Sequence, residues 1–474
     1  MGRNIFVKLS KVLFACFDLL IVNIGILLAF RVKFGHNIPE YNWNSYESVW
    51  LGLSLVSLVV FYMFDLYSNW RRKSIYNLIY AIVLSVGTLS LFTMALTFWY
   101  RGFSFPRSVI VLSFLIQVVL FISIRSLVWW AAKRKYGRRR VLIIDEKREQ
   151  AFLFAKKFLQ HTTGWFVIHD VLEAERWKKM IHTIHEVDVV LLSPMLSREE
   201  RAEILSYCSR YGKEVLLVPE LFELFILDAE PQQIDDMLVL SVQPPGLSAA
   251  QLFLKRLFDI VASLALITLL SPAMLILFIL VPATSRGPAI FKQERMGRNG
   301  KEYMIYKFRS MVQDAEKYTG PMLAVEKDSR ITPLGHFIRA TRLDEIPQLF
   351  NVLKGDMSLV GPRPERAFFI EQFSEMLPDY TYRMSVKPGI TGMAQVMARY
   401  STTAEDKLRF DLMYVRNYSL ALDIKILLQT IRVVFQWGQS KGVQHSEEAC
   451  HDEVLNQLGN YEAAAGRDTI TREK

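Results

Sequence analysis

Long apolar runs separated by short polar loops fill the first third of the chain. They cover roughly residues 12–30, 49–66, 78–99 and 109–130. Each run is close to the ~20 residues that a helix needs to cross the hydrocarbon core of a bilayer. The pattern therefore predicts a four-helix transmembrane bundle over residues 1–135. The first run is too long for a signal-peptide core and lacks a small-residue cleavage pattern, so we expect it to be retained.

Lysine and arginine flank these runs unequally. One side carries Arg3, Lys8, Lys11, Arg71, Arg72, Lys73, Lys133, Arg134, Lys135, Arg138, Arg139 and Arg140. The opposite loops carry only Arg31, Lys33, Arg101 and Arg107. Because loops rich in Lys and Arg stay in the cytoplasm, we expect the N-terminus and everything after Arg140 to be cytoplasmic. Asp18 and Asp65 lie near the ends of their runs, where we expect each carboxylate to reach the membrane interface.

A fifth apolar run, residues 260–282, is long enough to span a membrane but has Ser271-Pro272 at its centre. Proline removes a backbone donor and kinks a helix, and the serine hydroxyl can bond the carbonyl that is freed. Basic residues flank both ends, at Lys255, Arg256, Arg286, Lys292, Arg295 and Arg298. Two alternatives follow. One is a re-entrant helix over about residues 256–284, broken at Ser271-Pro272, and the other is an ordinary kinked transmembrane helix.

Residues 138–245 alternate strand-like and helix-like patterns. The strands are expected at 140–145, 165–171, 187–193 and 214–219, with helices at 147–160, 174–185 and 197–211. This alternation predicts a small cytoplasmic α/β domain of Rossmann-like type. Asp145 and Glu146 stand where a nucleotide-binding turn needs glycine, so we interpret the domain as structural or regulatory, with oligomerisation as one role.

Two histidines in this domain, His182 and His185, have a spacing that suits a metal, although solvated or capping histidines explain them more simply. The dipeptide Pro244-Pro245 with Gly246 indicates a linker to the next domain. The polar residues 440–474 lack apolar periodicity, which predicts a loosely ordered tail.

The composition adds a preference for anionic partners. The formal net charge is +10, which favours lipid headgroups, nucleotides and phosphates, although cytoplasmic loops of membrane proteins collect Lys and Arg in any case. The basic residues gather at membrane boundaries and beside an acidic pair, so we expect no nucleic acid to bind. Cys16, Cys208 and Cys450 lie far apart, which argues against a disulfide framework or a zinc site.

The candidate chemistry lies in residues 286–400. Strand-like runs at 289–295 and 302–308 are joined through Asn299-Gly300, which predicts a hairpin. Lys307 and Arg309 end the second strand, and Asp344-Glu345 precede a short amphipathic run that starts near Pro347. Either carboxylate would then lie at a helix N-terminus, where backbone N–H groups and the macrodipole also favour phosphate, whereas the simpler alternative is a capping Asp beside a solvated Glu.

Further cations stand in rigid, turn-rich surroundings. Arg363 lies between two prolines, which restrict where its guanidinium points. Arg383 and Lys387 follow, the latter before Pro388-Gly389. A cluster of arginines with carboxylates and glycine turns is what a phosphoryl-transfer site requires, although any single one of these residues could belong to a packed surface network.

The chain resembles a known family in four stretches: Lys307-Phe308-Arg309-Ser310-Met311, residues 342–361 (RLDEIPQLFNVLKGDMSLVG), Pro362-Arg363-Pro364-Glu365 and residues 387–392 (KPGITG). They resemble bacterial sugar transferases, the polyprenyl-phosphate hexose-1-phosphate transferases that initiate exopolysaccharide, capsule and O-antigen synthesis. The resemblance is strong over about residues 250–438. It is looser over the first 135 residues and the middle domain, which are similar to the long form of the family.

The resemblance implies a mainly α-helical catalytic domain with a re-entrant helix, in the bacterial cytoplasmic (inner) membrane, acting on a UDP-sugar and undecaprenyl phosphate. It implies an Asp344–Glu345 dyad. We expect Asp344 to be the nucleophile and Glu345 to hold Mg²⁺. The residues expected to bind phosphate are Lys307, Arg309, Arg339, Arg363, Arg383 and Lys387. The sugar stays open between galactose, glucose and N-acetylhexosamines, and so does the oligomeric state, with a homodimer as one alternative.

Two rival functions remain at this point. A membrane-anchored nucleotide-sugar dehydratase needs a Tyr-x-x-x-Lys pair, and Tyr303 and Lys307 have that spacing, but no glycine-rich dinucleotide turn precedes them. A lipid-carrier flippase or a non-catalytic assembly scaffold is the other rival. Flippases usually need more than four spanning helices.

Overall fold

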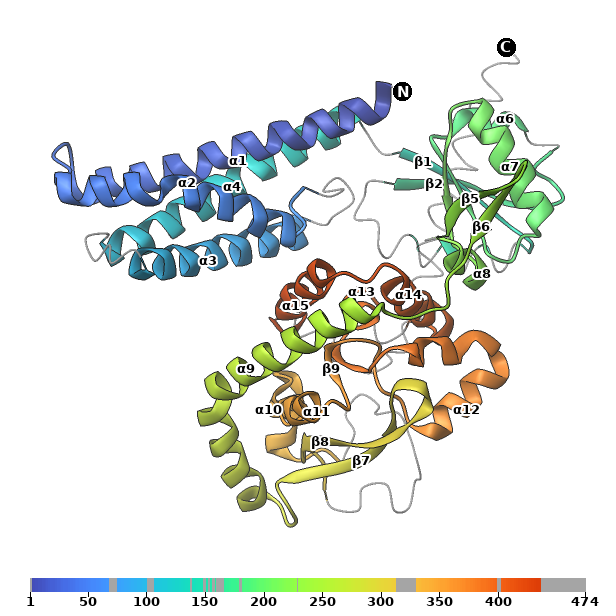
Figure 1. Ribbon diagram of the computed structural model, residues 1–474. Coiled ribbons are helices and arrows are strands. Elements are labelled where there is room, and N and C mark those ends of the chain that lie inside the picture. Colours follow the sequence, from blue (N-terminus) through green and yellow to red (C-terminus); the bar gives the residue numbers. More distant parts are fainter. Residues whose placement is uncertain are drawn as a thin grey trace. The chain divides into compact units, whose positions relative to one another are not determined.

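The computed structural model describes residues 2–67, 75–99, 106–136, 139–147, 151, 154–155, 158, 166–178, 181–227, 229–312, 330–398 and 402–435. These residues fall into two compact units that divide between Val218 and Pro219 (Figure 1). The predicted tail, residues 440–474, lies outside the described residues, as does the basic loop at Arg71–Lys73.

Four long helices open the first unit: α1 (Gly2–Phe34), α2 (Glu40–Met63), α3 (Ile75–Trp99) and α4 (Arg107–Tyr136). Each is long and apolar enough to cross a membrane. The helices pack against one another through buried aromatic and polar contacts. The rings of Phe61 and Phe121 meet edge to face, and the Gln117 amide donates to the Val22 carbonyl oxygen at 3.0 Å. Large apolar side chains such as Leu13 and Leu91 face outwards, as lipid contact requires.

Asp18 departs from the expectation that its carboxylate reaches the membrane interface. Its side chain is fully buried between helices, and its Oδ2 lies 2.6 Å from Nη2 of Arg125 on α4. An unpaired charge at this depth is costly, so a buried partner from a neighbouring helix offsets the cost. The expectation was wrong because Arg125, a cation inside the fourth apolar run, gives the Asp18 carboxylate a buried partner.

The α/β domain follows with the parallel sheet that its alternating pattern predicts. Its strands are β1 (Arg139–Asp145), β2 (Phe166–Glu173), β3 (Val189–Leu192) and β4 (Glu214–Leu217), in the order β2-β1-β3-β4. Strand β1 is apolar and buried because helices cover both faces of such a sheet.

The helices of this domain agree less well with the prediction. Helix α7 (Arg198–Arg210) starts at a capping box in which Ser197 and Glu200 exchange hydrogen bonds. Helix α6 covers only Ile181–Glu186, because residues 174–178 form turns, so the first half of the helix expected at 174–185 was wrong. Most of the helix expected at 147–160 lies outside the described residues. His185 packs on Tyr207 and Tyr211 rather than beside other ligands.

The second unit is mostly helical, with small sheets. It begins with α8 (Leu221–Phe225) and a hairpin of β5 (Glu230–Ile234) and β6 (Met237–Ser241), which the sequence pattern did not predict. The remaining elements are α9 (Ala249–Thr284), β7 (Ile290–Met296), η2 (Arg298–Gly300), β8 (Glu302–Phe308), α10 (Pro333–Ala340), η3 (Leu343–Glu345), α11 (Gln348–Lys354), β9 (Ser358–Val360), α12 (Ala367–Met376), η4 (Pro378–Ser385), β10 (Gly389–Thr391), α13 (Met393–Met397), α14 (Ala404–Arg416) and α15 (Leu420–Phe435). The β7–β8 hairpin forms as predicted, because Asn299 and Gly300 both adopt positive φ.

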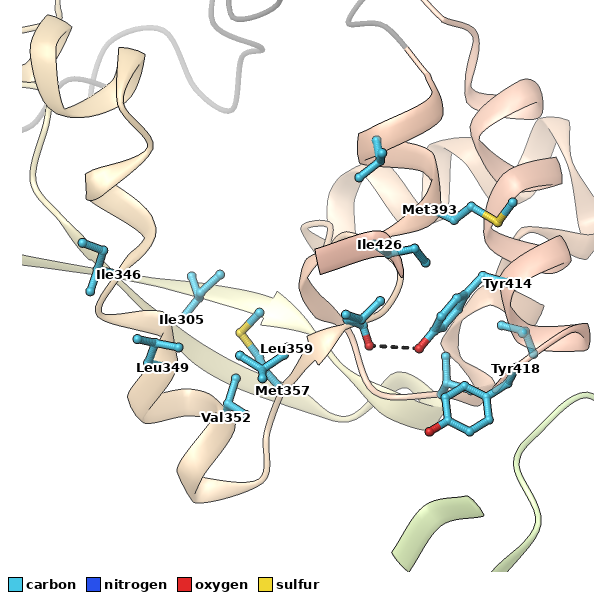
Figure 2. Close-up of a cluster of buried hydrophobic side chains, with 14 residues drawn as sticks. Ile305, Ile346, Leu349, Val352, Met357, Leu359, Met393, Tyr414, Tyr418 and Ile426 are labelled. Carbon is cyan, nitrogen blue, oxygen red and sulfur yellow. Dashed lines mark hydrogen bonds between the residues drawn. The ribbon is translucent and has the colours of Figure 1, made fainter. Parts of the chain in front are cut away.

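One apolar core joins α11, β8, β9, α14 and α15. Figure 2 shows Ile305, Leu349, Val352, Leu359 and Tyr414 among its side chains.

 The Leu359 side chain lies beside Met357 in this core, and the Tyr414 hydroxyl donates to the Val360 carbonyl oxygen at 3.1 Å. This core therefore fixes β9, the strand that leads into the loop carrying Arg363.

Helix α9 continues through Pro272 although one backbone hydrogen bond is missing there. Pro272 has no N–H for the Thr268 carbonyl oxygen, and the Ser271 hydroxyl donates to that oxygen at 2.9 Å instead. Figure 1 shows α9 changing direction partway along its length. Most of its apolar side chains are exposed, among them Leu257, Leu264 and Leu275.

Both ends of α9 are held by the same compact unit. Near its start, the Lys255 ammonium donates to Asp423, Tyr414 and the Val360 carbonyl oxygen. Past its end, the Arg309 guanidinium donates to the Ser285 carbonyl oxygen at 2.7 Å. Between these ends, Leu266, Leu270 and Met274 pack against the core of the same unit, so α9 lies along it with its other face exposed.

Candidate active site

The Asp344–Glu345 pair lies in a tight turn between α10 and α11. Arg342, which precedes the turn, adopts a left-handed conformation with φ of 59°. This conformation is rare for a residue other than glycine, and such strain concentrates at functional sites. Helix α11 starts only at Gln348, after Pro347, so neither carboxylate caps it. The charges around the pair therefore come from side chains rather than from a helix terminus.

Glu345 is the centre of an ion-pair cluster. Its Oε1 lies 3.1 Å from the Lys307 ammonium and 3.4 Å from Nη2 of Arg363, and its Oε2 lies 4.0 Å from Arg342. Burial alone would raise the pKa of Glu345, but Lys307 and Arg363 outweigh it and hold the pKa well below its usual range. Glu345 is therefore ionised at neutral pH.

Asp344 has the opposite electrostatic environment although it is the next residue. Burial, and then the charge of Glu345, raise its pKa to about 6. Lys307, Arg339 and Arg342 lower it only in part. Two adjacent carboxylates with pKa values pushed apart are suited to two different roles in one reaction. Asp344 is the more basic of the two.

The structure brings Lys307, Arg339 and Arg363 to the dyad but uses the other expected cations elsewhere. Arg309 holds the end of α9, where it donates to the carbonyl oxygens of Ser285 and Arg286. Lys387 lies beside Gly355 at the end of α11. Neither of these two side chains has a hydrogen bond to the dyad among the interactions of the described residues.

Arg383 acts on the site through Arg363. Its guanidinium lies 2.7 Å from the Asp411 carboxylate and donates to the Tyr380 hydroxyl at 2.7 Å. A second bond, at 3.0 Å, reaches the carbonyl oxygen of Arg363. Arg383 therefore fixes the backbone of the Arg363 loop rather than facing the dyad.

Two glycines allow the Arg363 loop to lie close to strand β10. The Gly361 N–H donates to the Thr391 carbonyl oxygen, and the Gly389 N–H donates to that of Pro362, both at 2.9 Å. A Cβ on Gly361 would lie 2.4 Å from the Lys387 carbonyl oxygen, and one on Gly389 would lie 2.1 Å from the Gly361 nitrogen. Only glycine fits this crossing.

Sequence reasoning missed two residues of this site. Arg342 stood within the quoted motif, three residues before Glu345, and that spacing was the available signal. Asp411 lies on α14, and no local pattern connects it to Arg383.

The carboxylates suit a metal ion that arrives with its substrate. Within the part of the chain that the structure describes, no group of three or more His, Cys, Asp and Glu residues is placed to hold a metal. Mg²⁺ is commonly held by one or two carboxylates together with substrate phosphates and water. Asp344 and Glu345 meet that requirement, and Oε2 of Glu345 is the oxygen less engaged by cations.

Apolar helices of membrane-spanning length, together with a carboxylate pair set among cations, are compatible with a membrane-associated transferase that acts on phosphate-bearing substrates. Residues 250–437 match the family model described as bacterial sugar transferase. A Klebsiella pneumoniae protein named UDP-glucose:undecaprenyl-phosphate glucose-1-phosphate transferase is 32% identical over 447 residues, which cover 87% of this chain and 93% of that protein. The chain therefore belongs to the bacterial sugar transferase family.

Two further relatives are more similar in sequence to this chain, over shorter alignments. An Aeromonas hydrophila protein named UDP-N-acetylgalactosamine-undecaprenyl-phosphate N-acetylgalactosaminephosphotransferase is 47% identical over 185 residues, or 38% of this chain and 44% of that protein. A Rhizobium leguminosarum bv. phaseoli protein named exopolysaccharide production protein PSS is 40% identical over 199 residues, or 40% of this chain and 98% of that protein. The names of the Klebsiella and Aeromonas proteins thus agree on transfer to undecaprenyl phosphate and differ in the sugar, whereas the Rhizobium name states only exopolysaccharide production.

Proposed function

We propose that this protein transfers a hexose-1-phosphate from a UDP-sugar to undecaprenyl phosphate, releases UMP and so initiates the assembly of a bacterial polysaccharide. The observation that carries the proposal is the pairing of Asp344, whose pKa is raised, with Glu345, which is held ionised by Lys307 and Arg363. The names of the relatives support the substrate classes.

The proposed reaction has two steps. An oxygen of the Asp344 carboxylate attacks the sugar-bearing phosphorus of the UDP-sugar, the bond to the bridging oxygen breaks, and UMP leaves. The phosphate of undecaprenyl phosphate then attacks the same phosphorus and displaces Asp344, giving undecaprenyl diphosphate-sugar. A covalent intermediate suits one water-soluble substrate and one lipid substrate, because neither has to wait for the other.

Cations offset the repulsion between Asp344 and the diphosphate. Two like charges ~4 Å apart cost about 4 kcal/mol at an effective dielectric constant of 20. Lys307, Arg339 and Arg363 supply counter-charge, and Arg383 holds the Arg363 loop in place. These positive groups are fixed before the substrate binds, which is the arrangement that stabilises charge during phosphoryl transfer.

Helix α9 is proposed to be the re-entrant helix that anchors this site at the membrane surface. Both of its ends contact the same unit, whereas a spanning helix would separate them across the bilayer. Its exposed apolar side chains, such as Leu264 and Leu275, would lie in lipid. The flanking Lys and Arg residues support a cytoplasmic location for both ends, at the inner membrane.

Mg²⁺ is proposed to bind with the UDP-sugar at Glu345. It would supply positive charge to the diphosphate oxygens and to the departing UMP. Adding EDTA is therefore expected to stop UMP release, and added Mg²⁺ is expected to restore it. The measurement is UMP formation in detergent or nanodiscs, with Ca²⁺ as the control ion. Undiminished release in EDTA would remove the metal from the proposal.

The pKa of Asp344 sets the expected pH dependence. A carboxylate that attacks phosphorus must be ionised, so the rate should be level above pH 7 and fall about tenfold per unit below a pH of about 6. The measurement is single-turnover UMP release without lipid, because a phosphate monoester itself titrates near pH 6. Thermal unfolding at each pH serves as the control. A level profile from pH 8 to pH 5 would contradict the role of Asp344.

A panel of UDP-sugars tests the proposed function itself. UDP-glucose, UDP-galactose and the two UDP-N-acetylhexosamines are each incubated with the full-length protein and undecaprenyl phosphate. We expect UMP and a lipid-linked sugar from at least one of them. Absence of UMP from all four would favour a scaffold or flippase, and NAD that remains bound through purification would favour a dehydratase.

A further inference from the structure

Gln348 has a buried amide that the proposed mechanism does not use. The residue is 2% exposed, and its Nε2 has no hydrogen-bond partner among the residues that the structure describes. Buried side-chain donors are nearly always paired, so an unpaired one calls for an explanation. The residue opens α11, three positions after Glu345.

The amide lines a small cavity beside the dyad. The other polar side chains around this cavity belong to Arg295, Lys307, Glu345 and Arg363. Three of these four are cationic, so the cavity has a surplus of positive charge that favours an anion. Nε of Arg295, in the same wall, is a second buried donor for which the described part of the chain supplies no acceptor. The cavity therefore offers unused donors to an acceptor that carries negative charge.

Asn351, on the same helix, has a side-chain amide whose nitrogen and oxygen are both hydrogen-bonded. Nδ2 of Asn351 donates to the Met304 carbonyl oxygen at 2.7 Å, and its Oδ1 accepts from the Tyr306 N–H at 3.0 Å. Asn351 thus binds α11 to β8 and has a structural role. Gln348, one helical turn earlier, makes no such bond from its Nε2 to any residue within the described ranges.

We propose that Gln348 is a substrate-binding residue whose Nε2 donates to a non-bridging oxygen of the UDP-sugar diphosphate. This inference rests on the proposed function and adds a neutral donor to its cationic site. The amide supplies direction without further charge. It can pair with a phosphate oxygen only when substrate is present, which explains why the donor is left open in the protein alone.

The test compares Gln348→Met with the wild-type protein. Methionine has similar length and no donor, so the variant should unfold at the same temperature as wild type or higher, because an unpaired polar group is removed. The kcat/KM for the UDP-sugar should fall about ten- to a hundredfold, the range for a hydrogen bond to a charged group. The kcat/KM of Gln348→Glu should be lower still, because a carboxylate repels the diphosphate. The matched control, Asn351→Leu, should lower the unfolding temperature.

The outcomes separate this inference from the proposed function. If wild-type protein releases UMP and Gln348→Met keeps kcat/KM within twofold, the inference fails and the function stands. A loss of activity that only follows a loss of stability would also overturn it. A large change, in Gln348→Met, in the Mg²⁺ concentration that gives half the maximal rate would also overturn the inference. That result would assign the Gln348 side chain to the metal. If wild-type protein releases no UMP, the proposed function itself fails.

Discussion

Replacing Asp344 with asparagine is expected to lower the rate of sugar-phosphate transfer at least about 10⁴-fold and to leave the protein folded. Asparagine has no anionic oxygen to attack phosphorus, and loss of a nucleophile costs a covalent mechanism nearly all of its rate. The measurements are UMP release and thermal unfolding at pH 7. Asp379→Asn makes the same chemical change on η4, away from the dyad, and should keep wild-type activity.

The stability of the Asp344 variant follows from linkage. The folded-state pKa of about 6 lies above the ordinary value of 3.8, so the folded protein holds this proton more tightly than the unfolded chain does. The stabilisation that Asp344 contributes is full below a pH of about 4 and is lost as the pH rises through 6. At pH 7 the ionised carboxylate disfavours folding, so the neutral variant should unfold at the wild-type temperature or higher. A markedly lower unfolding temperature would contradict the raised pKa.

Replacing Glu345 with glutamine is expected to have the opposite effect on stability. The change leaves Lys307, whose side chain is 20% exposed, without its carboxylate partner at 3.1 Å. Breaking a buried ion pair costs about 3–5 kcal/mol of stability. Because this pair is partly exposed, we expect the free energy of unfolding to fall by about 3 kcal/mol. Activity should fall as well, because Arg363 loses the anion that orients it. The measurements are denaturant unfolding and UMP release.

A double variant separates the two effects of Glu345. Adding Lys307→Met to Glu345→Gln removes both charges, so most of the lost stability should return. Activity should stay low, because both groups act on the diphosphate. If the Asp344 variant keeps or gains stability and the Glu345 variant loses it, the two carboxylates have different electrostatic environments. Equal responses of the Asp344 and Glu345 variants would contradict them.

Local patterns predicted much of the fold because their causes are local. The length of apolar runs sets the helices α1 to α4, and the positive φ required at Asn299 and Gly300 sets the β7–β8 hairpin. The β5–β6 hairpin escaped prediction because Pro231, Gln232 and Gln233 give its first strand a polar pattern. Alternating apolar positions are the main signal for a strand, and they are missing there.

The residues of the candidate site could be predicted where they form one contiguous motif. Contacts between residues that lie far apart in the sequence could not be predicted. Asp344 and Glu345 could be read from one stretch. The roles of Arg309 and Arg383 depend on partners that lie elsewhere in the sequence. Arg309 binds the end of α9, and Arg383 binds Asp411 on α14. Asp18 and Arg125 likewise pair across 107 positions of the chain. Charge alone says that an arginine needs a partner, but only the fold decides which one.

The most direct test of the account is to trap the proposed intermediate. Full-length protein is incubated with Mg²⁺ and a UDP-sugar labelled with ³²P at the sugar-bearing phosphate, without undecaprenyl phosphate, and is then denatured. We expect the label to remain on the wild-type protein, to leave when the lipid phosphate is added before denaturation, and to be absent from Asp344→Asn. Label retained on the Asp344→Asn protein, or no label on a wild-type protein that releases UMP, would contradict attack by Asp344.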